Sequence, residues 1–243
     1  MKEYYDLIML VIANQTNDNC YNDFINEYWY KFIKYVNNNK SNLKIFLLFG
    51  EKPIDINIDD SNILITNTKE CLIPGILHKT IYAFEYCNNT YNYKHILRTN
   101  LSSFFILDKL LEMNYNLSDK GVYAGLEFKW GIGGSEIWLS NDVITYIVLN
   151  KDKLNYNKID DVAIGMLLRN KFNKLNIDLY NPFYMLNKEK SDKLIENRTT
   201  IFKEVIDNNY HLIRLKQQHG DRTNDIKMVK YLWNFFYDNS KEI

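Results

Sequence analysis

The chain has 243 residues, of which 46% are hydrophobic, and its 30 basic side chains balance its 30 acidic ones. This length and apolar content suffice for one α/β domain with a sizeable core. The formal net charge of +0 gives no electrostatic footprint for DNA or RNA and no basic tail for a membrane surface, which excludes both as main partners.

The cysteines and the N-terminal segment bear on the compartment. Cys20, Cys71 and Cys87 share no CxxC spacing, which favours a reducing compartment over a disulfide framework or a zinc knuckle. The apolar run over residues 7–13 is too short for a signal peptide or a membrane span. We therefore expect a cytoplasmic protein. Heavy use of Asn, Ile, Lys and Tyr indicates an AT-rich genome, such as that of a large DNA virus or a protist, and the expected location then becomes the host cytoplasm or the virion.

The first hundred residues alternate apolar runs with segments of helical spacing. Continuous apolar runs predict interior strands of a mostly parallel sheet, and apolar residues three and four apart predict helices. The expected elements are a strand over 7–13, a loop over 14–19, a helix over 21–36, strands over 43–49 and 63–65, a helix over 75–86 after Pro74, and a strand over 95–99. Strands that alternate with helices predict an α/β domain.

The rest of the chain is less regular. Ser102 or Ser103 is expected to cap a helix over 104–113, because serine favours that position. The further expected elements are a strand over 122–130, a helix from Asn141 or Asp142 to residue 149, a helix over 160–172, an extended segment over 211–215 and a last helix over 224–237.

A glycine-rich stretch precedes two adjacent acids that open an apolar helix. Gly131, Gly133 and Gly134 permit close backbone approach or positive φ, and Asp160 and Asp161 follow. One interpretation is a base held beside a small bound substrate. At a helix N-terminus, the dipole is expected to keep such a carboxylate ionised and only weakly basic. The other interpretation is that the two acids merely cap the helix and that the glycines form a turn.

The best cationic cluster lies over residues 211–216, followed by 219–222. Strand alternation places His211, Ile213 and Leu215 on one face, with Arg214 and Lys216 on the other. Arginine binds phosphate oxygens through two hydrogen bonds, and lysine binds them as a point charge. A solvated charged edge is the alternative. His78 and His95 stand beside apolar residues and are expected to be structural.

In their order, these motifs resemble the GT-A glycosyltransferases and, more narrowly, the β-1,3-galactosyltransferase and Fringe group. The resemblance covers about residues 5–170. The segments that carry it are 46–50, 62–66 with Glu70, 75–80 with its Lys79-Thr80 ending, 93–103, 133–140 with Asp142, and 160–162 with Gly165. It implies a single GT-A (Rossmann-like) domain over 1–243, with a mixed, mostly parallel central sheet flanked by helices. Residues 1–100 would form the nucleotide-binding half, and residues 101–243 the acceptor half and the C-terminal helix.

The resemblance also implies an activity. A hexosyltransferase-like enzyme would move a sugar from a nucleotide-sugar donor, expected to be a UDP-sugar, to a hydroxyl of a glycan or glycoprotein acceptor with inversion. Asp161 would be the general base and Asp160 its neighbour in the acceptor site. The nucleotide would lie at the loops 14–19 and 49–52, at the carboxyl ends of the first strands. The implied donor-side residues are Lys79, Arg98, Asn100, Ser102, His211, Arg214 and Lys216, and the implied acceptor or sugar pocket comprises Trp130, Gly133, Gly134, Ser135 and Glu136.

Some of these assignments leave alternatives open. Lys79, on a helix face, would ordinarily point to water. Trp138 is expected in the core, whereas Trp130 is open between core and sugar pocket.

One motif departs from the resembled family. Segment 93–103 stands where that family carries a metal-binding Asp-x-Asp, and here Asn100 and Ser102 replace the carboxylates. A hard divalent cation prefers carboxylate oxygen, so dependence on Mn²⁺ or Mg²⁺ is left open, with Asn100, Ser102 and His211 as candidate ligands. Either Arg98 and other cations neutralise the donor diphosphate, or the chain is a catalytically inactive GT-A-like module that binds a nucleotide, a glycan or a partner protein.

Overall fold

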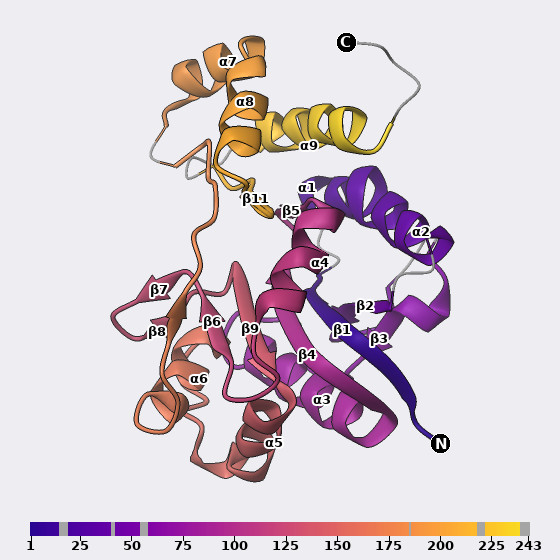
Figure 1. Ribbon diagram of the computed structural model, residues 1–243, viewed down its shortest axis with the longest axis vertical. Coiled ribbons are helices and arrows are strands. Elements are labelled where there is room, and N and C mark those ends of the chain that lie inside the picture. The colour runs from indigo at the N-terminus through magenta and orange to yellow at the C-terminus, as the bar shows by residue number, and fades with distance from the viewer. Residues whose placement is uncertain (15–18, 40–41, 54–57, 185, 218–221, 239–243) are drawn as a thin grey trace. The chain divides into compact units, whose positions relative to one another are not determined.

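The computed structural model (Figure 1) describes residues 1–14, 19–39, 42–53, 58–184, 186–217 and 222–238. The chain divides into two compact units. The first, called the sheet unit, comprises Met1–Gln15, Ile33–Asn100 and Asn114–Asp178, and the second, called the helical unit, comprises Thr16–Phe32, Leu101–Met113 and Leu179–Ile243. The single domain over 1–243 and its two halves stay predictions.

A seven-stranded sheet of order β10-β6-β9-β4-β1-β2-β3 forms the sheet unit. Its strands are β1 (Glu3–Ile12), β2 (Leu43–Phe49), β3 (Ile63–Ile65), β4 (Tyr91–Asn100), β6 (Tyr123–Gly125), β9 (Glu136–Ser140) and β10 (Leu175–Asn176). Strands β3, β2, β1 and β4 are parallel, β9 runs antiparallel to both β4 and β6, and β10 runs parallel to β6. The predicted α/β class, with a mixed, mostly parallel central sheet flanked by helices, is confirmed.

One face of this sheet is covered by three helices that share a single core with it. They are α3 (Gly75–Thr90), α5 (Asn141–Leu149) and α6 (Asp160–Leu168), and Ile8, Leu10 and Ile12 of β1 belong to the same core. The intervening β1 residues are buried as well, which explains why an interior parallel strand reads as a continuous apolar run. No helix among the described residues has both the length and the apolar character needed to cross a bilayer.

Strand register sets what lies at the carboxyl end of β4. Ile12 of β1 pairs with Asn100, and on the other side of β4, Arg98 pairs with Ile137 of β9. The Arg98 and Asn100 side chains therefore share one face of the strand, because they are two residues apart.

The helical unit has an aromatic core. Tyr28 stacks on Phe104 with ring centroids 4.6 Å apart, and its hydroxyl accepts a hydrogen bond of 2.8 Å from the Phe105 backbone N–H. The elements of this unit are α1 (Asn19–Phe24), a π-helical turn (Ile25–Trp29), β5 (Ser103–Phe105), α7 (Lys188–Glu196), α8 (Thr199–Asp207), β11 (Leu212–Arg214) and α9 (Thr223–Phe236). The helices α2 (Tyr30–Asn38) and α4 (Leu107–Asn116) each contribute residues to both units.

Several expected boundaries are wrong. Ser102 and Ser103 do not cap a helix, because Ser103 opens β5, which pairs antiparallel with β11, and α4 begins only at Leu107. The expected strand over 122–130 is interrupted at Gly125, whose φ is +140°. The helix that starts at residue 160 ends at Leu168 instead of 172.

Other elements differ less or were not expected. The helices α7 and α8, the strand β10, the short hairpin of β7 (Glu127–Phe128) with β8 (Gly131–Ile132), and the 3-10 turns Asp60–Asn62 and Lys151–Lys153 were not expected. The expected strands over 43–49 and 63–65 match β2 and β3 at both ends, and the other expected strands and helices are present with at least one shifted end. Most of the expected loop over 14–19, and residues 219–221 with His219, lie outside the described residues.

Candidate active site

The two acids at the start of α6 differ in environment. The N-cap residue is Ile159, which makes no side-chain capping bond, so both acids lie within the first turn of the helix. Asp160 is buried, whereas Asp161 is half-buried. Neither acid is therefore the N-cap, and each has a different set of partners within the sheet unit.

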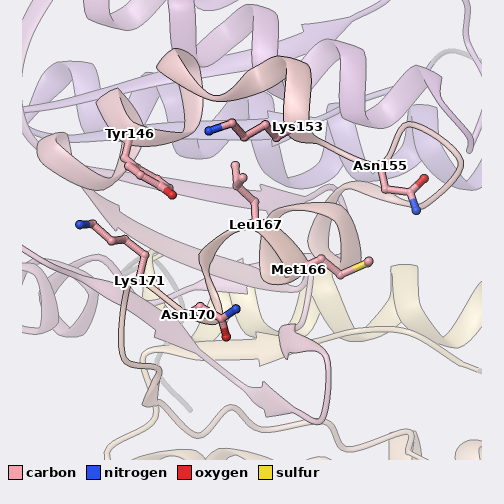
Figure 2. A pocket seen from close by; sticks show the side chains of 7 residues that line it. All are labelled: Tyr146, Lys153, Asn155, Met166, Leu167, Asn170 and Lys171. Carbon is pink, nitrogen blue, oxygen red and sulfur yellow. The ribbon is translucent and has the colours of Figure 1, made fainter.

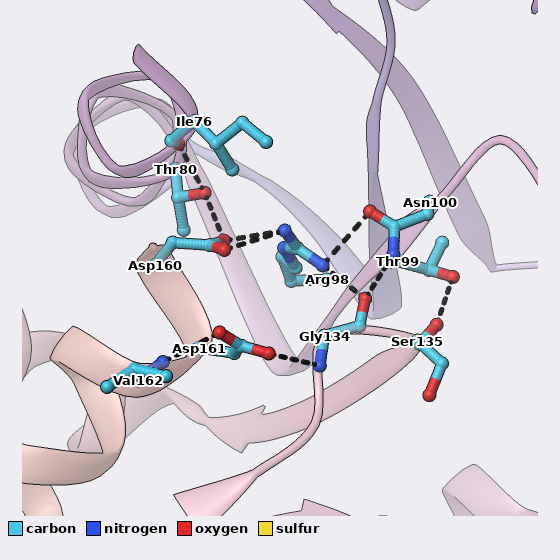
Figure 3. Close-up of polar contacts among 10 residues, drawn as sticks. All are labelled: Ile76, Thr80, Arg98, Thr99, Asn100, Gly134, Ser135, Asp160, Asp161 and Val162. Carbon is cyan, nitrogen blue, oxygen red and sulfur yellow. Dashed lines mark hydrogen bonds and ion pairs between the residues drawn. The ribbon is translucent and has the colours of Figure 1, made fainter. Parts of the chain in front are cut away.

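Asp160 forms a buried ion pair with Arg98 of β4. The Arg98 Nη2 lies 2.7 Å from one carboxylate oxygen and 2.9 Å from the other, and both side chains are 3% exposed. The Thr80 hydroxyl of α3 donates a further hydrogen bond of 2.9 Å to the same carboxylate. Figure 3 shows that these contacts join β4, α3 and α6. Such charge-assisted bonds fix the carboxylate in place.

Asp161 is held differently. One oxygen accepts the backbone N–H of Gly134 at 2.9 Å, and the other accepts the N–H of Val162 at 2.7 Å. Burial raises the pKa of Asp161, and the negative charge of Asp160 raises it further, while Arg98 and the two N–H donors oppose the shift. The helix dipole was expected to keep Asp161 ionised and only weakly basic. The pKa of Asp161 is instead raised, because loss of hydration outweighs the two N–H donors.

Gly134 connects both acids to the end of β4. Its carbonyl oxygen accepts hydrogen bonds from Arg98 Nη1 and, at 2.5 Å, from Asn100 Nδ2, while its N–H donates to Asp161 (Figure 3). A Cβ added at this position would lie 2.8 Å from Arg98 Nη1 and 3.2 Å from the Asp161 carboxylate. A side chain at this position would require the Arg98 guanidinium and the Asp161 carboxylate to shift.

The oxygens around the Arg98 guanidinium are engaged by that side chain and leave no place for a divalent cation. The Asp160 carboxylate, the Asn100 Oδ1 and the Gly134 carbonyl oxygen all accept hydrogen bonds from the Arg98 guanidinium. These are the oxygen types that Mg²⁺ or Mn²⁺ would need, and a resident positive charge already engages them. The described part of the chain contains no group of three or more His, Cys, Asp or Glu side chains that could hold a metal ion.

Lys79 is buried instead of solvated. It is 1% exposed, and its Nζ donates to the Ala13 carbonyl at 2.8 Å and contacts Glu70 at 2.5 Å. The other Glu70 oxygen accepts the Gly50 N–H at 2.5 Å. Burial lowers the pKa of Lys79. The pair therefore ties together the residues that directly follow β1 and β2, the strand ends where the nucleotide was expected.

The remaining donor-side candidates belong to the helical unit. Ser102 and His211 are buried, Arg214 is half-buried and its Nη1 donates to the Ser103 hydroxyl at 3.1 Å, and Lys216 is exposed. His211 and its alternate neighbours are buried while the two basic residues are not, as the strand alternation predicted.

Aromatic residues line the hairpin before the glycine-rich stretch. Trp130 is 45% exposed and Phe128 is 38% exposed, and their rings stack 4.9 Å apart at an interplanar angle of 8°. Trp130 is therefore not a core residue. Trp138 is fully buried, as predicted, and its Nε1 donates to Glu136 at 3.0 Å. Glu136 is also fully buried, and Ser135 accepts through its carbonyl from Thr99 at 2.6 Å.

Sequence reasoning missed Thr80 and Phe128. Thr80 belongs to the Lys-Thr ending quoted for the resemblance, but nothing in the sequence indicated its partner 80 residues away. Phe128 lies against Gly133, where an added Cβ would come within 2.4 Å of the ring. The run of glycines was the available signal for such a close aromatic neighbour.

A pocket of about 370 Å³ lies elsewhere in the sheet unit (Figure 2). It is lined by Tyr146, Lys153, Asn155, Met166, Leu167, Asn170 and Lys171. None of these is a predicted site residue, and none is a carboxylate that could act as a base. The candidate site is therefore defined by the contacts at the N-terminus of α6 and not by this pocket.

Comparisons with known proteins bear on the fold. No family model and no curated protein matches the chain. Among solved structures, the chain is similar to a glycosyltransferase involved in the glycosylation of the major capsid of the virus PBCV-1, with 7% sequence identity, a TM-score of 0.50, and coverage of 93% of this chain and 98% of that one.

Two further structures are similar over part of their length. They are the apo-form glycosyltransferase GlyE of Streptococcus pneumoniae, at 14% identity, a TM-score of 0.49 and 96% of this chain, and the catalytic domain of Drosophila β1,4-galactosyltransferase 7 in complex with xylobiose, at 10% identity, a TM-score of 0.42 and 72% of this chain. The chain spans only 62% and 64% of these two chains, respectively. The likeness to the PBCV-1 enzyme concerns the fold and agrees with the GT-A assignment, while the narrower Fringe-group resemblance stays a prediction.

Proposed function

We propose that this chain is a glycosyltransferase that moves a sugar from a UDP-sugar to a hydroxyl of a glycan or glycoprotein acceptor with inversion. The observation that carries the proposal is the half-buried carboxylate of Asp161, with its raised pKa, held against Gly134 in a fold that resembles a solved glycosyltransferase. The order of motifs over residues 5–170 supports the narrower, hexosyltransferase-like assignment.

In this proposal Asp161 is the general base. The acceptor oxygen attacks the anomeric carbon while the bond from that carbon to the diphosphate oxygen breaks, and Asp161 takes the proton from the acceptor hydroxyl. A base is most effective when its pKa lies near the working pH, so the raised pKa of Asp161 favours this role. The nucleoside diphosphate leaves with the electron pair of the broken bond.

Asp160 and Lys79 have positioning roles. The Asp160 oxygens are engaged by Arg98 and Thr80, so this acid acts on the neighbouring base through its charge and not by direct contact with acceptor. Lys79 and Glu70 hold the ends of β1 and β2, where ligands bind in open α/β sheets. Donor-diphosphate roles for Ser102, His211, Arg214 and Lys216 stay predictions from the sequence.

The aromatic pair of Phe128 and Trp130 is the proposed acceptor platform. Half-exposed, nearly parallel rings offer an apolar face to the C–H groups of a pyranose. The pair precedes the glycine-rich stretch, whose Gly134 contacts the proposed base.

The test is a nucleotide-sugar panel with the full chain. Asp161→Asn should lower the transfer rate by about 10²- to 10⁴-fold, the usual value of a positioned base, while calorimetric UDP binding stays unchanged. Asp152→Asn, at an exposed acid of the same unit, is the matched control and should retain full activity. Unchanged turnover in Asp161→Asn would remove this residue from its role. UDP binding by the wild type without turnover of any donor would favour the inactive module instead.

A further inference from the structure

The side chain of Arg98 fills a cage made of oxygen atoms. One of its terminal nitrogens donates hydrogen bonds to Oδ1 of Asn100 and to the carbonyl oxygen of Gly134, and the other forms an ion pair with both carboxylate oxygens of Asp160. Arg98 is only 2% exposed, and a Cβ built on Gly134 would come within 2.8 Å of it. The guanidinium therefore has little room to leave the cage and is closely packed against its ligands.

These oxygens make up the set of donors that a hard divalent cation prefers. A carboxylate, a side-chain amide oxygen and a backbone carbonyl oxygen are the usual protein ligands of such ions. In this chain the cation among these oxygens is the guanidinium of Arg98 on β4, and an arginine does not lose its proton in proteins. A second cation entering the same cage would be repelled strongly at that distance.

We infer that the Arg98 guanidinium is a built-in replacement for a divalent cation, and that the cage becomes a cation site when this side chain is shortened. The inference deepens the proposed function, because a UDP-sugar would then be bound and transferred without Mn²⁺ or Mg²⁺. The cage itself is a property of the folded chain and exists whether or not the chain transfers sugar. Its test can therefore be separated from the test of the activity.

The experiment measures Mn²⁺ binding to the full chain by electron paramagnetic resonance, with Ca²⁺ as competitor. Arg98→Ala should bind Mn²⁺ at least about 100-fold more tightly than wild type, because the repelling charge is gone and the Asp160 carboxylate is left without its partner. The double variant Arg98→Ala/Asp160→Asn should lose this gain. Arg169→Ala, at an exposed arginine that ends the same helix α6, is the matched control and should gain nothing.

Thermal unfolding gives an independent readout. Mn²⁺ should raise the Tm of Arg98→Ala and leave the Tm of wild type and of the double variant unchanged, because only a cation bound to the native state stabilises it. If Arg98→Ala folds only when Mn²⁺ is added, the inference is supported. A folded Arg98→Ala without a new Mn²⁺ site, a variant that Mn²⁺ does not help to fold, or a wild type that binds Mn²⁺ equally tightly at Asp160 would overturn it. If transfer is detected, its rate in the wild type should be the same with and without EDTA.

Discussion

Replacing Asp160 with asparagine isolates the energetic value of the buried ion pair. The wild-type carboxylate makes two contacts with Arg98, at 2.7 and 2.9 Å, and accepts a hydrogen bond from Thr80. Asparagine keeps one oxygen for these donors but removes the charge, which leaves Arg98 buried and uncompensated. Loss of one partner of a buried pair costs about 3–5 kcal/mol, a large part of the roughly 5–15 kcal/mol by which domains are stable.

The assay is equilibrium unfolding in urea, followed by circular dichroism and by tryptophan fluorescence. The matched control is Glu85→Gln, which breaks the Lys151–Glu85 pair of the same unit, whose side chains are 44% and 30% exposed. Because a surface pair contributes about 0–1 kcal/mol, this variant should unfold close to wild type. In a double-mutant cycle, Arg98→Gln combined with Asp160→Asn should lose less stability than the two single variants added together.

If Asp160→Asn and Glu85→Gln lose the same free energy of unfolding, the charge of Asp160 is solvated in the native protein. The cage around Arg98 would then be open to water, and the assignment of Asp160 as a buried positioning residue would be wrong.

Four further predictions address the base and its charged neighbour, the buried lysine and the close packing of α6. The pKa of Asp161 is raised in the folded state above its ordinary value of 3.8. The stability that its protonated form contributes is therefore present below pH 3.8 and is lost as the pH rises through the raised pKa. Asp161→Asn should gain stability over wild type across this rise in pH, as measured by urea unfolding at a series of pH values. Asp160→Asn should shift the acidic limb of the rate profile to lower pH, since a like charge is removed; no shift would exclude this coupling. Lys79→Met should cost about 3 kcal/mol in urea unfolding, the lower end for a buried pair, and a loss under about 1 kcal/mol would mean that the lysine is solvated. Gly165→Ala would place a Cβ 2.4 Å from a backbone carbonyl oxygen and should lower the free energy of unfolding by about 1–3 kcal/mol. The control Met166→Ala, at an exposed position, should unfold near wild type. Equal losses of stability in the two variants would rule out close packing at Gly165.

The sequence predicted the elements whose burial is uniform along the chain. The strands β1 and β2 are apolar at every core position, so their identity does not depend on distant partners. In contrast, Phe104 and Phe105 were expected to open a helix capped by Ser102 or Ser103. Ser103–Phe105 is instead a strand because it pairs with Leu212–Arg214, more than a hundred residues later. Such pairing leaves no local signal in the sequence. The helices α7 and α8 were missed because the stretch that holds them carries many polar residues and few buried ones.

The sequence predicted several residues of the candidate site but not which of them contact one another. Asp161 and Gly134 were singled out separately, and their hydrogen bond could not be derived from residues 27 positions apart. Arg98 was expected near a diphosphate, yet it lies in the interior paired with Asp160, 62 residues away. Burial of a charged side chain depends on a partner brought by the fold, which spacing alone does not specify.

The contact between Gly134 and Arg98 limits how this site can change in evolution. Since a Cβ at residue 134 would lie 2.8 Å from the guanidinium, a larger residue at 134 requires either a shift of the end of the Arg98 side chain or a smaller residue at 98. In more distant versions of this chain we expect the two positions to covary in size: a short acidic residue at 98 would make space for alanine or serine at 134, whereas an arginine at 98 is expected together with glycine at 134.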